Sequence, residues 1–213
     1  MAFKINSSDY VEYIKAFYDL LQENKDYITE LDLATGDGDH WLNMNTGFGE
    51  VIKIEEELKT MDLQSLFKKI GMTLMSKVGG SSGVLYGGAY MAAAKSLEGV
   101  EYIGRDELYN LYNAMLDDIM KRGKTEIGQK TMVDALAPAV EVLKIKSGQE
   151  ATDNELLDSL TKASSEGASA TKEMEALRGR ASYQTNKGVG HLDPGAVTMA
   201  YQIETLCNYI LQK

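Results

Sequence analysis

The sequence predicts an all-α protein in which eight antiparallel helices form one bundle or barrel. Apolar residues recur at helical spacing along most of the chain, whereas the alternating pattern of strands is weak. Proline is also almost absent, with only Pro138 and Pro194 among 213 residues, so few positions interrupt a helix. Because the connections between the predicted helices are short, successive helices should run antiparallel.

Four helices are predicted in the first half of the chain. The first follows the polar segment NSSD, and the second begins just after an aspartate-rich loop. Asp62 caps the third, which stops at the segment GGSSG (79–83), and the fourth, rich in glycine and alanine, runs from about 84 to 97. The apolar faces of the first three comprise Val11, Ile14, Tyr18 and Leu21; Met44, Phe48, Val51 and Ile52; and Leu63, Leu66, Phe67, Ile70 and Leu74.

Four more helices are predicted in the second half: one capped by Asp106, one at about 131–146, one capped by Asp153, and one at about 195–211. Aspartates cap the first and the third of these helices, and the third is rich in alanine. The helix at 131–146 contains Pro138, which removes one backbone hydrogen bond and should kink it. Ser147-Gly148 is the signal that ends the helix at 131–146. The apolar face of the helix capped by Asp106 comprises Leu108, Leu111, Met115 and Ile119.

Size and composition indicate one domain, 1–213, in a reducing compartment. The hydrophobic fraction of 44% is ordinary for a globular protein, and the single cysteine, Cys207, excludes an internal disulfide. No apolar run approaches the roughly 20 residues needed to span a bilayer, and the start of the chain, MAFKINSSDY, lacks the apolar stretch of a signal peptide. We therefore expect a cytoplasmic protein without membrane association.

The formal net charge of −10 argues against nucleic-acid binding, because an acidic surface repels phosphate backbones. An anionic ligand would need a local source of positive charge. A metal ion is the obvious source.

The glycine-rich segments TGDGDH, GGSSG, RGKTEIGQKT and GRASY…GHLDPG all lie between predicted helices. They follow the first, third, fifth and seventh helices, and alternate loops of an antiparallel bundle lie at the same end. One end of the bundle is therefore built from loops that allow close backbone approach, and we expect a ligand there.

The segment DLATGDGDHWLN indicates a metal site. Asp37 and Asp39 flank a glycine and can aim two carboxylates at one point, and Asp32 can supply a third. Carboxylates this close repel one another unless a cation neutralises them, and hard oxygen ligands favour Mg²⁺ or Ca²⁺. An EF-hand is excluded, because Leu42 and Phe48 stand where glycine and glutamate are needed, and no Walker A loop is present. The alternative is an acidic surface turn in which Asp39 caps a helix.

The other loops carry weaker signals. The segment GGSSG offers backbone N–H groups and hydroxyls to a phosphate, or it is a flexible connector. Arg180 can clamp a phosphate or be an ordinary surface charge, and Asp193 beside Pro194 reads most simply as a helix N-cap. The two histidines and one cysteine give no support for a zinc site.

Taken together, GDGDH…N.N.GF, GGSSG, G.KTM.DAL.PA and GRASY…G..DPGA occur in this order along nearly the whole chain. In that order they resemble the nucleotide-binding (L) subunits of dihydroxyacetone kinases. The resemblance implies a barrel of eight antiparallel helices that binds a nucleotide at one end. It also implies that Asp32, Asp37 and Asp39 are catalytic and hold two Mg²⁺ ions, and that the ADP or ATP pocket comprises His40, Trp41, Leu42, Asn43, Ser81, Ser82, Gly123, Met132, Arg180, Asp193, Pro194 and Gly195.

The resemblance further implies a division of labour between proteins. In this family dihydroxyacetone is held on a histidine of a separate K subunit, and this chain contains no such domain. A stand-alone L chain resembles the phosphoenolpyruvate-dependent type, in which bound ADP is recharged by a phosphohistidine M subunit of the phosphotransferase system. A homodimer is also expected.

Trp41 departs from the family pattern, which has glycine after GDGDH. An indole at this position could reshape the pocket mouth or a docking surface. Two alternatives therefore stay open: a non-catalytic regulatory paralogue that binds a partner protein, and a kinase for another short ketose or a protein-bound fatty acid. The intact aspartate triad argues against the first, because a pure binding module has no use for three clustered carboxylates.

Overall fold

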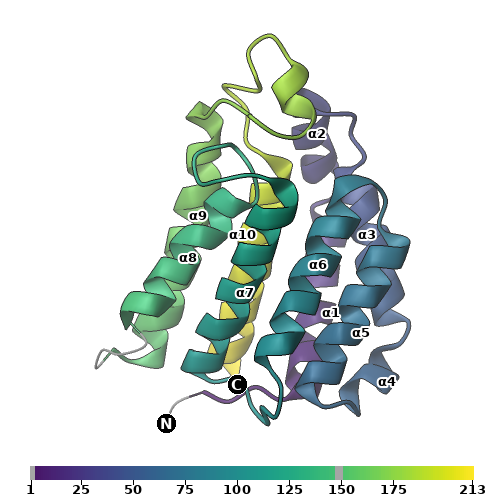
Figure 1. Cartoon of the computed structure of the whole chain (residues 1–213), viewed down its shortest axis with the longest axis vertical. Coiled ribbons are helices and arrows are strands. Elements are labelled where there is room, and N and C mark those ends of the chain that lie inside the picture. Colours follow the sequence, from purple (N-terminus) through teal and green to yellow (C-terminus); the bar gives the residue numbers. More distant parts are fainter. Residues whose placement is uncertain (1–2, 147–150) are drawn as a thin grey trace.

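The computed structural model describes residues 3–146 and 151–213, and it confirms the all-α class (Figure 1). Within these residues the chain forms ten α-helices and two short 3₁₀ helices, and its one β-type pairing is an isolated bridge between Ile5 and Ile103. The α-helices are α1 (Ser7–Glu23), α2 (Lys25–Thr35), α3 (His40–Ile52), α4 (Glu55–Lys59), α5 (Leu63–Lys77), α6 (Gly80–Ser96), α7 (Arg105–Gly123), α8 (Val133–Lys146), α9 (Asp153–Ala170) and α10 (Pro194–Gln212), and the 3₁₀ helices are η1 (Thr171–Glu173) and η2 (Arg180–Tyr183).

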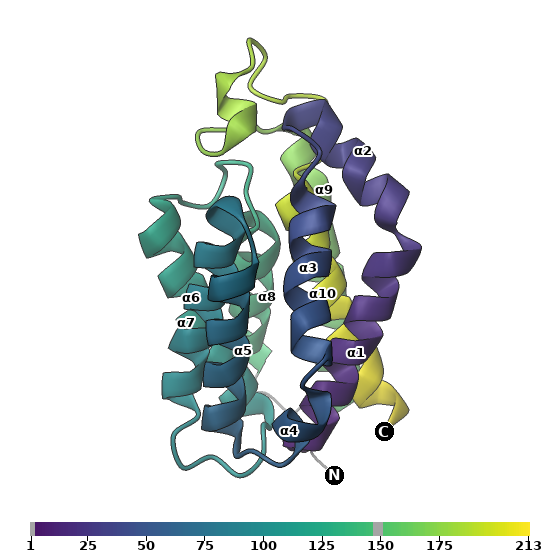
Figure 2. The same cartoon turned by 90° about the vertical axis from the view of Figure 1, so that its right-hand side faces the viewer.

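Eight long helices close into a barrel. In chain order, α1, α3, α5, α6, α7, α8, α9 and α10 each pack on the next, and α10 packs back on α1. Figure 2 shows the helices side by side along one direction, with α2 leaning over one end and the short α4 at the other. One continuous apolar cluster fills the interior, with aromatic side chains such as Phe17, Phe48 and Phe67 fully buried. The eight predicted helices are thus the eight helices that form the barrel.

Two helices were missed by the sequence analysis, α2 and α4. Helix α2 begins after a break at Asn24 and presents Ile28, Asp32 and Thr35 to the interior, so its buried face is mostly polar. An apolar periodicity therefore could not reveal it. Helix α4 has only five residues, too few to show a period. Asp32 consequently lies on a helix, not in a loop as predicted.

The predicted start of the fourth helix is also corrected. Helix α6 begins at Gly80, so GGSSG forms its first turn and is not a separate connector. The N-caps of α7 and α9 are Gly104 and Thr152, which lie two residues and one residue before the predicted caps Asp106 and Asp153. At Thr152 a capping box decides the boundary, because Thr152 and Glu155 satisfy each other's backbone N–H groups.

Pro138 lies inside α8, as predicted, whereas the predicted end at Ser147-Gly148 lies outside the described residues. Asp62 caps α5 and Asp193 caps α10, both through a carboxylate that accepts a backbone N–H. None of the helices in the described ranges is long and apolar enough to cross a membrane.

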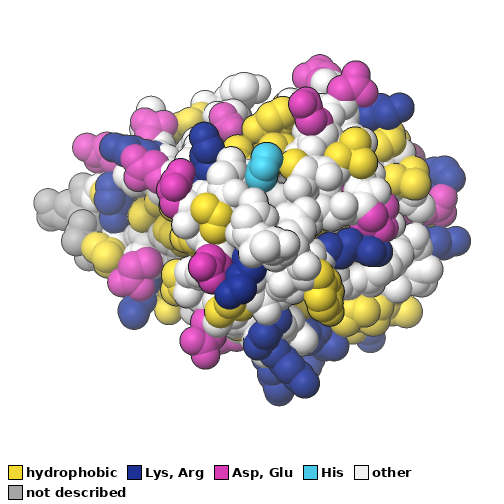
Figure 3. Space-filling view, turned by 90° about the horizontal axis from the view of Figure 1, so that it is seen from above, with side chains coloured by type: hydrophobic (Ala, Val, Ile, Leu, Met, Phe, Trp, Pro, Cys, Tyr) yellow, Lys and Arg dark blue, Asp and Glu magenta, His cyan; other side chains and the backbone are white. Residues whose placement is uncertain are grey.

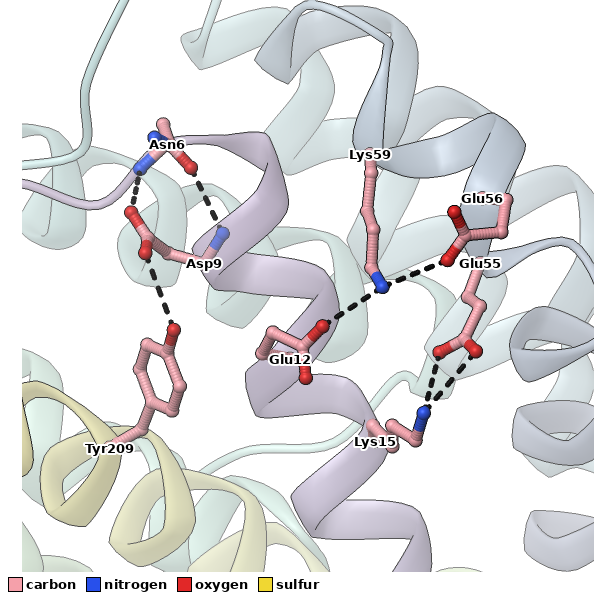
Figure 4. Close-up of polar contacts among 8 residues, drawn as sticks. All are labelled: Asn6, Asp9, Glu12, Lys15, Glu55, Glu56, Lys59 and Tyr209. Atoms are coloured by element: carbon pink, nitrogen blue, oxygen red, sulfur yellow. Dashed lines mark hydrogen bonds and ion pairs between the residues drawn. The ribbon is translucent and has the colours of Figure 1, made fainter.

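The end of the barrel opposite the glycine-rich loops is tied by polar contacts (Figure 4). Lys15 of α1 pairs with Glu55 of α4 at 3.2 Å, and Lys59 pairs with Glu12 at 2.9 Å. Exposed pairs of this kind contribute about 0–1 kcal/mol each. They therefore help to place α4, while most of the stability comes from the buried apolar residues.

Candidate functional site

The four glycine-rich connections meet at one end of the barrel, as predicted, and enclose a cavity of about 500 Å³. These connections join α2 to α3, α5 to α6, α7 to α8, and α9 to α10. Figure 3 looks onto this end and shows acidic and basic side chains side by side on it. The size is typical of a small-molecule site, since such cavities span about 300–1,000 Å³.

Three carboxylates converge on one wall of the cavity. Asp32 lies in the last turn of α2 and is only 8% exposed. Asp37 lies in the α2–α3 loop, and Asp39 is the residue that precedes α3. One oxygen from each carboxylate lies within 4.8 Å of the other two. The backbone makes this possible, because Gly38 adopts φ +77°, a conformation that favours glycine.

This group fits a hard divalent cation. All three donors are carboxylate oxygens, the ligand type that Mg²⁺ and Ca²⁺ prefer. Asp32 is held in place, since one of its carboxylate oxygens accepts the backbone N–H of His40 at 2.9 Å. Arg180 lies beside the cluster, with its guanidinium 2.6 Å from a carboxylate oxygen of Asp37. The cluster thus presents three carboxylates to the cavity, and Arg180 is paired with one of them.

The N-terminus of α10 forms another part of the cavity lining. Asp193 caps this helix by accepting the N–H of Ala196 at 2.7 Å, and Pro194 and Gly195 follow at the cavity surface. Burial raises the pKa of Asp193 to about 7. This carboxyl therefore changes protonation state near neutral pH.

The rest of the cavity lining contains both polar and apolar residues. Ser81 and Ser82 lie in the first turn of α6, where free backbone N–H groups and the positive end of the helix dipole favour an anion. The lining also includes the apolar side chains of Leu85, Ile119 and Met132, with Leu85 beside Gly123 and Met132 beside Gly195. The cavity therefore offers polar groups to an anion and apolar side chains to a flat ring.

Three of the predicted pocket residues do not line the cavity: Trp41, Leu42 and Asn43. Trp41 is half-buried, and its indole N–H donates to the carbonyl of Leu21 at 2.8 Å. Lys25 lies over its ring, 5.0 Å from the centroid. Trp41 therefore covers the junction of α1 and α2 and does not line this cavity, while the expectation that it shapes the pocket mouth or a docking surface stays a prediction. Successive residues of a helix point about 100° apart, so Trp41 and Leu42 face away from the cavity when His40 faces inward. Asn43 lies almost one turn after His40, and its side-chain oxygen approaches Gly79, the residue before α6, where a Cβ would lie 3.0 Å from it.

The His40 side chain points into the barrel. It is 7% exposed, and its Nε2 lies 2.9 Å from the hydroxyl of Thr198 on α10. Burial lowers the pKa of His40, although the Asp32 and Asp39 carboxylates act in the opposite direction. The imidazole is therefore suited to joining α3 to α10, while the backbone of the same residue positions Asp32.

The remaining predicted residues all line the cavity, which brings together Asp32, Asp37, Asp39, His40, Ser81, Ser82, Gly123, Met132, Arg180, Asp193, Pro194 and Gly195. Sequence reasoning missed several neighbours, among them Arg122, Lys130 and Arg178. Arg178 could have been suggested by its place two residues before Arg180. Nothing in the pattern around Lys130 indicates that its side chain is buried.

A family model described as the DAK2 domain matches residues 34–208 of this chain. The ADP-binding subunit DhaL of the PTS-dependent dihydroxyacetone kinase of Lactococcus lactis is 42% identical over 200 residues, covering 94% of this chain and 96% of that protein. The ADP-binding subunit DhaL of the PEP-dependent dihydroxyacetone kinase of Escherichia coli is 34% identical over 202 residues, covering 95% and 96%. Both similarities thus extend nearly from end to end.

The dihydroxyacetone kinase from C. freundii, solved with AMP-PNP and Mg²⁺, has a similar fold. Its crystal structure matches with a TM-score of 0.72 at 25% sequence identity, covering 93% of this chain and 33% of the kinase. This chain therefore spans about a third of that kinase.

Proposed function

Because this chain belongs to the DAK2-domain family, we propose that it is the ADP-binding, phosphoryl-transferring subunit of a phosphoenolpyruvate-dependent dihydroxyacetone kinase. One observation carries the proposal: three carboxylates within 4.8 Å of one another line a cavity of about 500 Å³. Such a group is suited to holding magnesium against the phosphates of a nucleotide. The names of two relatives that match almost end to end support the same reading.

The nucleotide is proposed to lie along the cavity. Its phosphates would face the aspartates and the first turn of α6, and its base would lie against apolar side chains of the lining such as Leu85 and Met132. Asp32, Asp37 and Asp39 would hold two Mg²⁺ ions. When bound, these ions neutralise charge on the phosphates and on the transferred group.

The protein's own residues then act by position and charge. Arg180, whose guanidinium lies 2.6 Å from Asp37, would donate to a phosphate oxygen and add positive charge beside the transferred phosphoryl group. The backbone N–H groups near Ser81 and Ser82 would do the same from the other side. Phosphoryl transfer to and from ADP requires alignment and charge neutralisation, so the chain needs no nucleophile of its own.

The acceptor and the donor are proposed to come from other proteins. A K subunit would present dihydroxyacetone, and a phosphohistidine M subunit would recharge ADP, each docking over the loop end and excluding water from the transfer. The C. freundii dihydroxyacetone kinase supports this division, because this chain matches only a third of that larger protein. The expected homodimer stays a prediction that light scattering of the purified chain can check.

The test is calorimetric titration of ADP in the presence of Mg²⁺. Wild type should bind, whereas Asp37→Asn and Asp39→Asn should lose magnesium-dependent affinity and keep their helical circular dichroism. Asp26→Asn is the matched control, because Asp26 lies exposed on α2, the helix that carries Asp32, and the same unit of charge is removed. Wild-type affinity in both site variants, or equal loss in the control, would disprove the aspartate assignment.

A further inference from the structure

Lys130 is an unusual residue of the α7–α8 connection. Its side chain is only 2% exposed, and its backbone is in the left-handed region with φ +60°. Lysine is almost never fully buried unless its charge is paired, and a non-glycine residue at positive φ is uncommon. Both features have a cost in stability, so the position calls for an explanation in terms of its contacts.

The ammonium of Lys130 joins the two ends of the 171–193 connection between α9 and α10. Its Nζ donates to the backbone carbonyl of Thr171 and to that of His191. Thr171 in turn accepts the backbone N–H of Asp193 at 3.0 Å through its hydroxyl. One buried cation thus closes the base of a loop that carries Arg180 and ends at Asp193.

The aliphatic part of the Lys130 side chain also packs against this connection. Gly188 passes so close that a Cβ there would lie 2.9 Å from Lys130 Cε, and Gly188 has φ +73°. Only a residue without a side chain allows the chain to cover the lysine in this way. Farther along the connection, the Arg178 side chain donates to the carbonyl of Lys124 at 2.6 Å.

The turn that presents Lys130 is itself held by a buried carboxylate. Asp134, 2% exposed, accepts the backbone N–H of Gly128 at 2.5 Å and that of Thr131 at 2.8 Å. Burial lowers the pKa of Lys130, whereas the nearby carboxylates of Asp193, Glu173 and Asp134 raise it. These carboxylates favour the charged form that makes the two carbonyl contacts.

We propose that Lys130 is a positioning residue for the nucleotide site. By tying both ends of the 171–193 connection to the α7–α8 turn, it fixes Asp193 in the cavity lining and Arg180 beside the aspartate cluster. An apolar side chain of the same length would leave two carbonyls without their donor, and the connection would loosen. The effect on nucleotide affinity rests on the proposed function, whereas the effect on the connection does not.

The experiment compares Lys130→Met, Lys130→Arg and the control Lys124→Met, which changes an exposed lysine of the same connection that also has positive φ. Trypsin cleaves after lysine and arginine, and the connection contains Lys172, Arg178, Arg180 and Lys187. Lys130→Met should be cut there faster than wild type and should bind Mg·ADP at least about tenfold more weakly, the scale of a lost charged hydrogen bond. Lys130→Arg, which keeps the charge and the donors, should recover part of both, and the control should match wild type.

Normal protease resistance together with unchanged ADP affinity in Lys130→Met would overturn the proposal, as would an equal effect in Lys124→Met. If Lys130→Met does not fold, Gly188→Ala gives a second route, because it pushes the connection away while leaving the lysine in place. It should show the same two changes. If wild type itself does not bind Mg·ADP, the proposed function fails, while the comparison of cleavage rates still tests the role of Lys130.

Discussion

Asp193 illustrates how one side chain serves both the fold and the site. Its carboxyl caps α10 through Ala196, and the same carboxyl faces a cavity with other acids nearby. Burial raises its pKa to about 7, with Asp134 and Asp32 acting in the same direction and Lys130 in the opposite one. The cap is therefore formed by a group that is costly to ionise in place.

A pH dependence of stability follows from this residue. Because the folded-state pKa lies above the ordinary value, the folded state binds more protons than the unfolded chain between the two, and stability falls as pH rises toward about 7. In Asp193→Asn the amide keeps the capping oxygen and does not titrate. Denaturant unfolding without nucleotide should therefore show wild type losing stability relative to Asp193→Asn from pH 4 to pH 7. A constant difference across this range would contradict the assignment.

At the scale of the element, the sequence allowed the barrel helices to be predicted because their inner faces are apolar. Helix α2 escaped because Asp32 and Thr35 occupy its buried face, and those polar residues serve the site. The predicted site residues that line the cavity came from loops with glycine and charge together, a pattern visible in sequence. Lys130 could not be predicted, since its burial depends on the 171–193 connection folding over it. The direction of Trp41 could not be predicted either, because it depends on where α3 begins.

Helix packing beside the site depends on glycine at a close crossing. In α9, a Cβ at Gly167 would lie 2.1 Å from the backbone carbonyl oxygen of Asp134 on α8. Gly167→Ala should therefore destabilise the protein by about 1–3 kcal/mol, because backbone must move. Gly49→Ala in α3 is the control, since its Cβ would meet the Tyr18 hydroxyl at 3.3 Å, the far end of a side chain. Helix propensity favours alanine over glycine by about 1 kcal/mol, so the control should be near neutral. Equal chemical denaturation midpoints in the two variants would refute the close-crossing account.

At the scale of the whole molecule, the ligand is proposed to join the four connections that meet at one end of the barrel. A ligand that binds only the folded state at 100 times its Kd adds about 2.7 kcal/mol of stability. For a chain of this size, that corresponds to about 5–10 °C in melting temperature. Thermal unfolding should shift by this amount when ADP and Mg²⁺ are both present, and far less with either alone. No shift with both present would argue against a nucleotide at the loop end.

The central claim is that this chain supplies half of an active site, the nucleotide half. The measurement is formation of dihydroxyacetone phosphate in a reconstituted system with a K subunit and a phosphohistidine donor. The lone chain with dihydroxyacetone and Mg·ATP should give no product. Product should appear only when both partners are added, it should be lost with Asp37→Asn, and it should persist with Asp26→Asn. Robust turnover by the lone chain, or full activity of the reconstituted Asp37→Asn variant, would contradict the account.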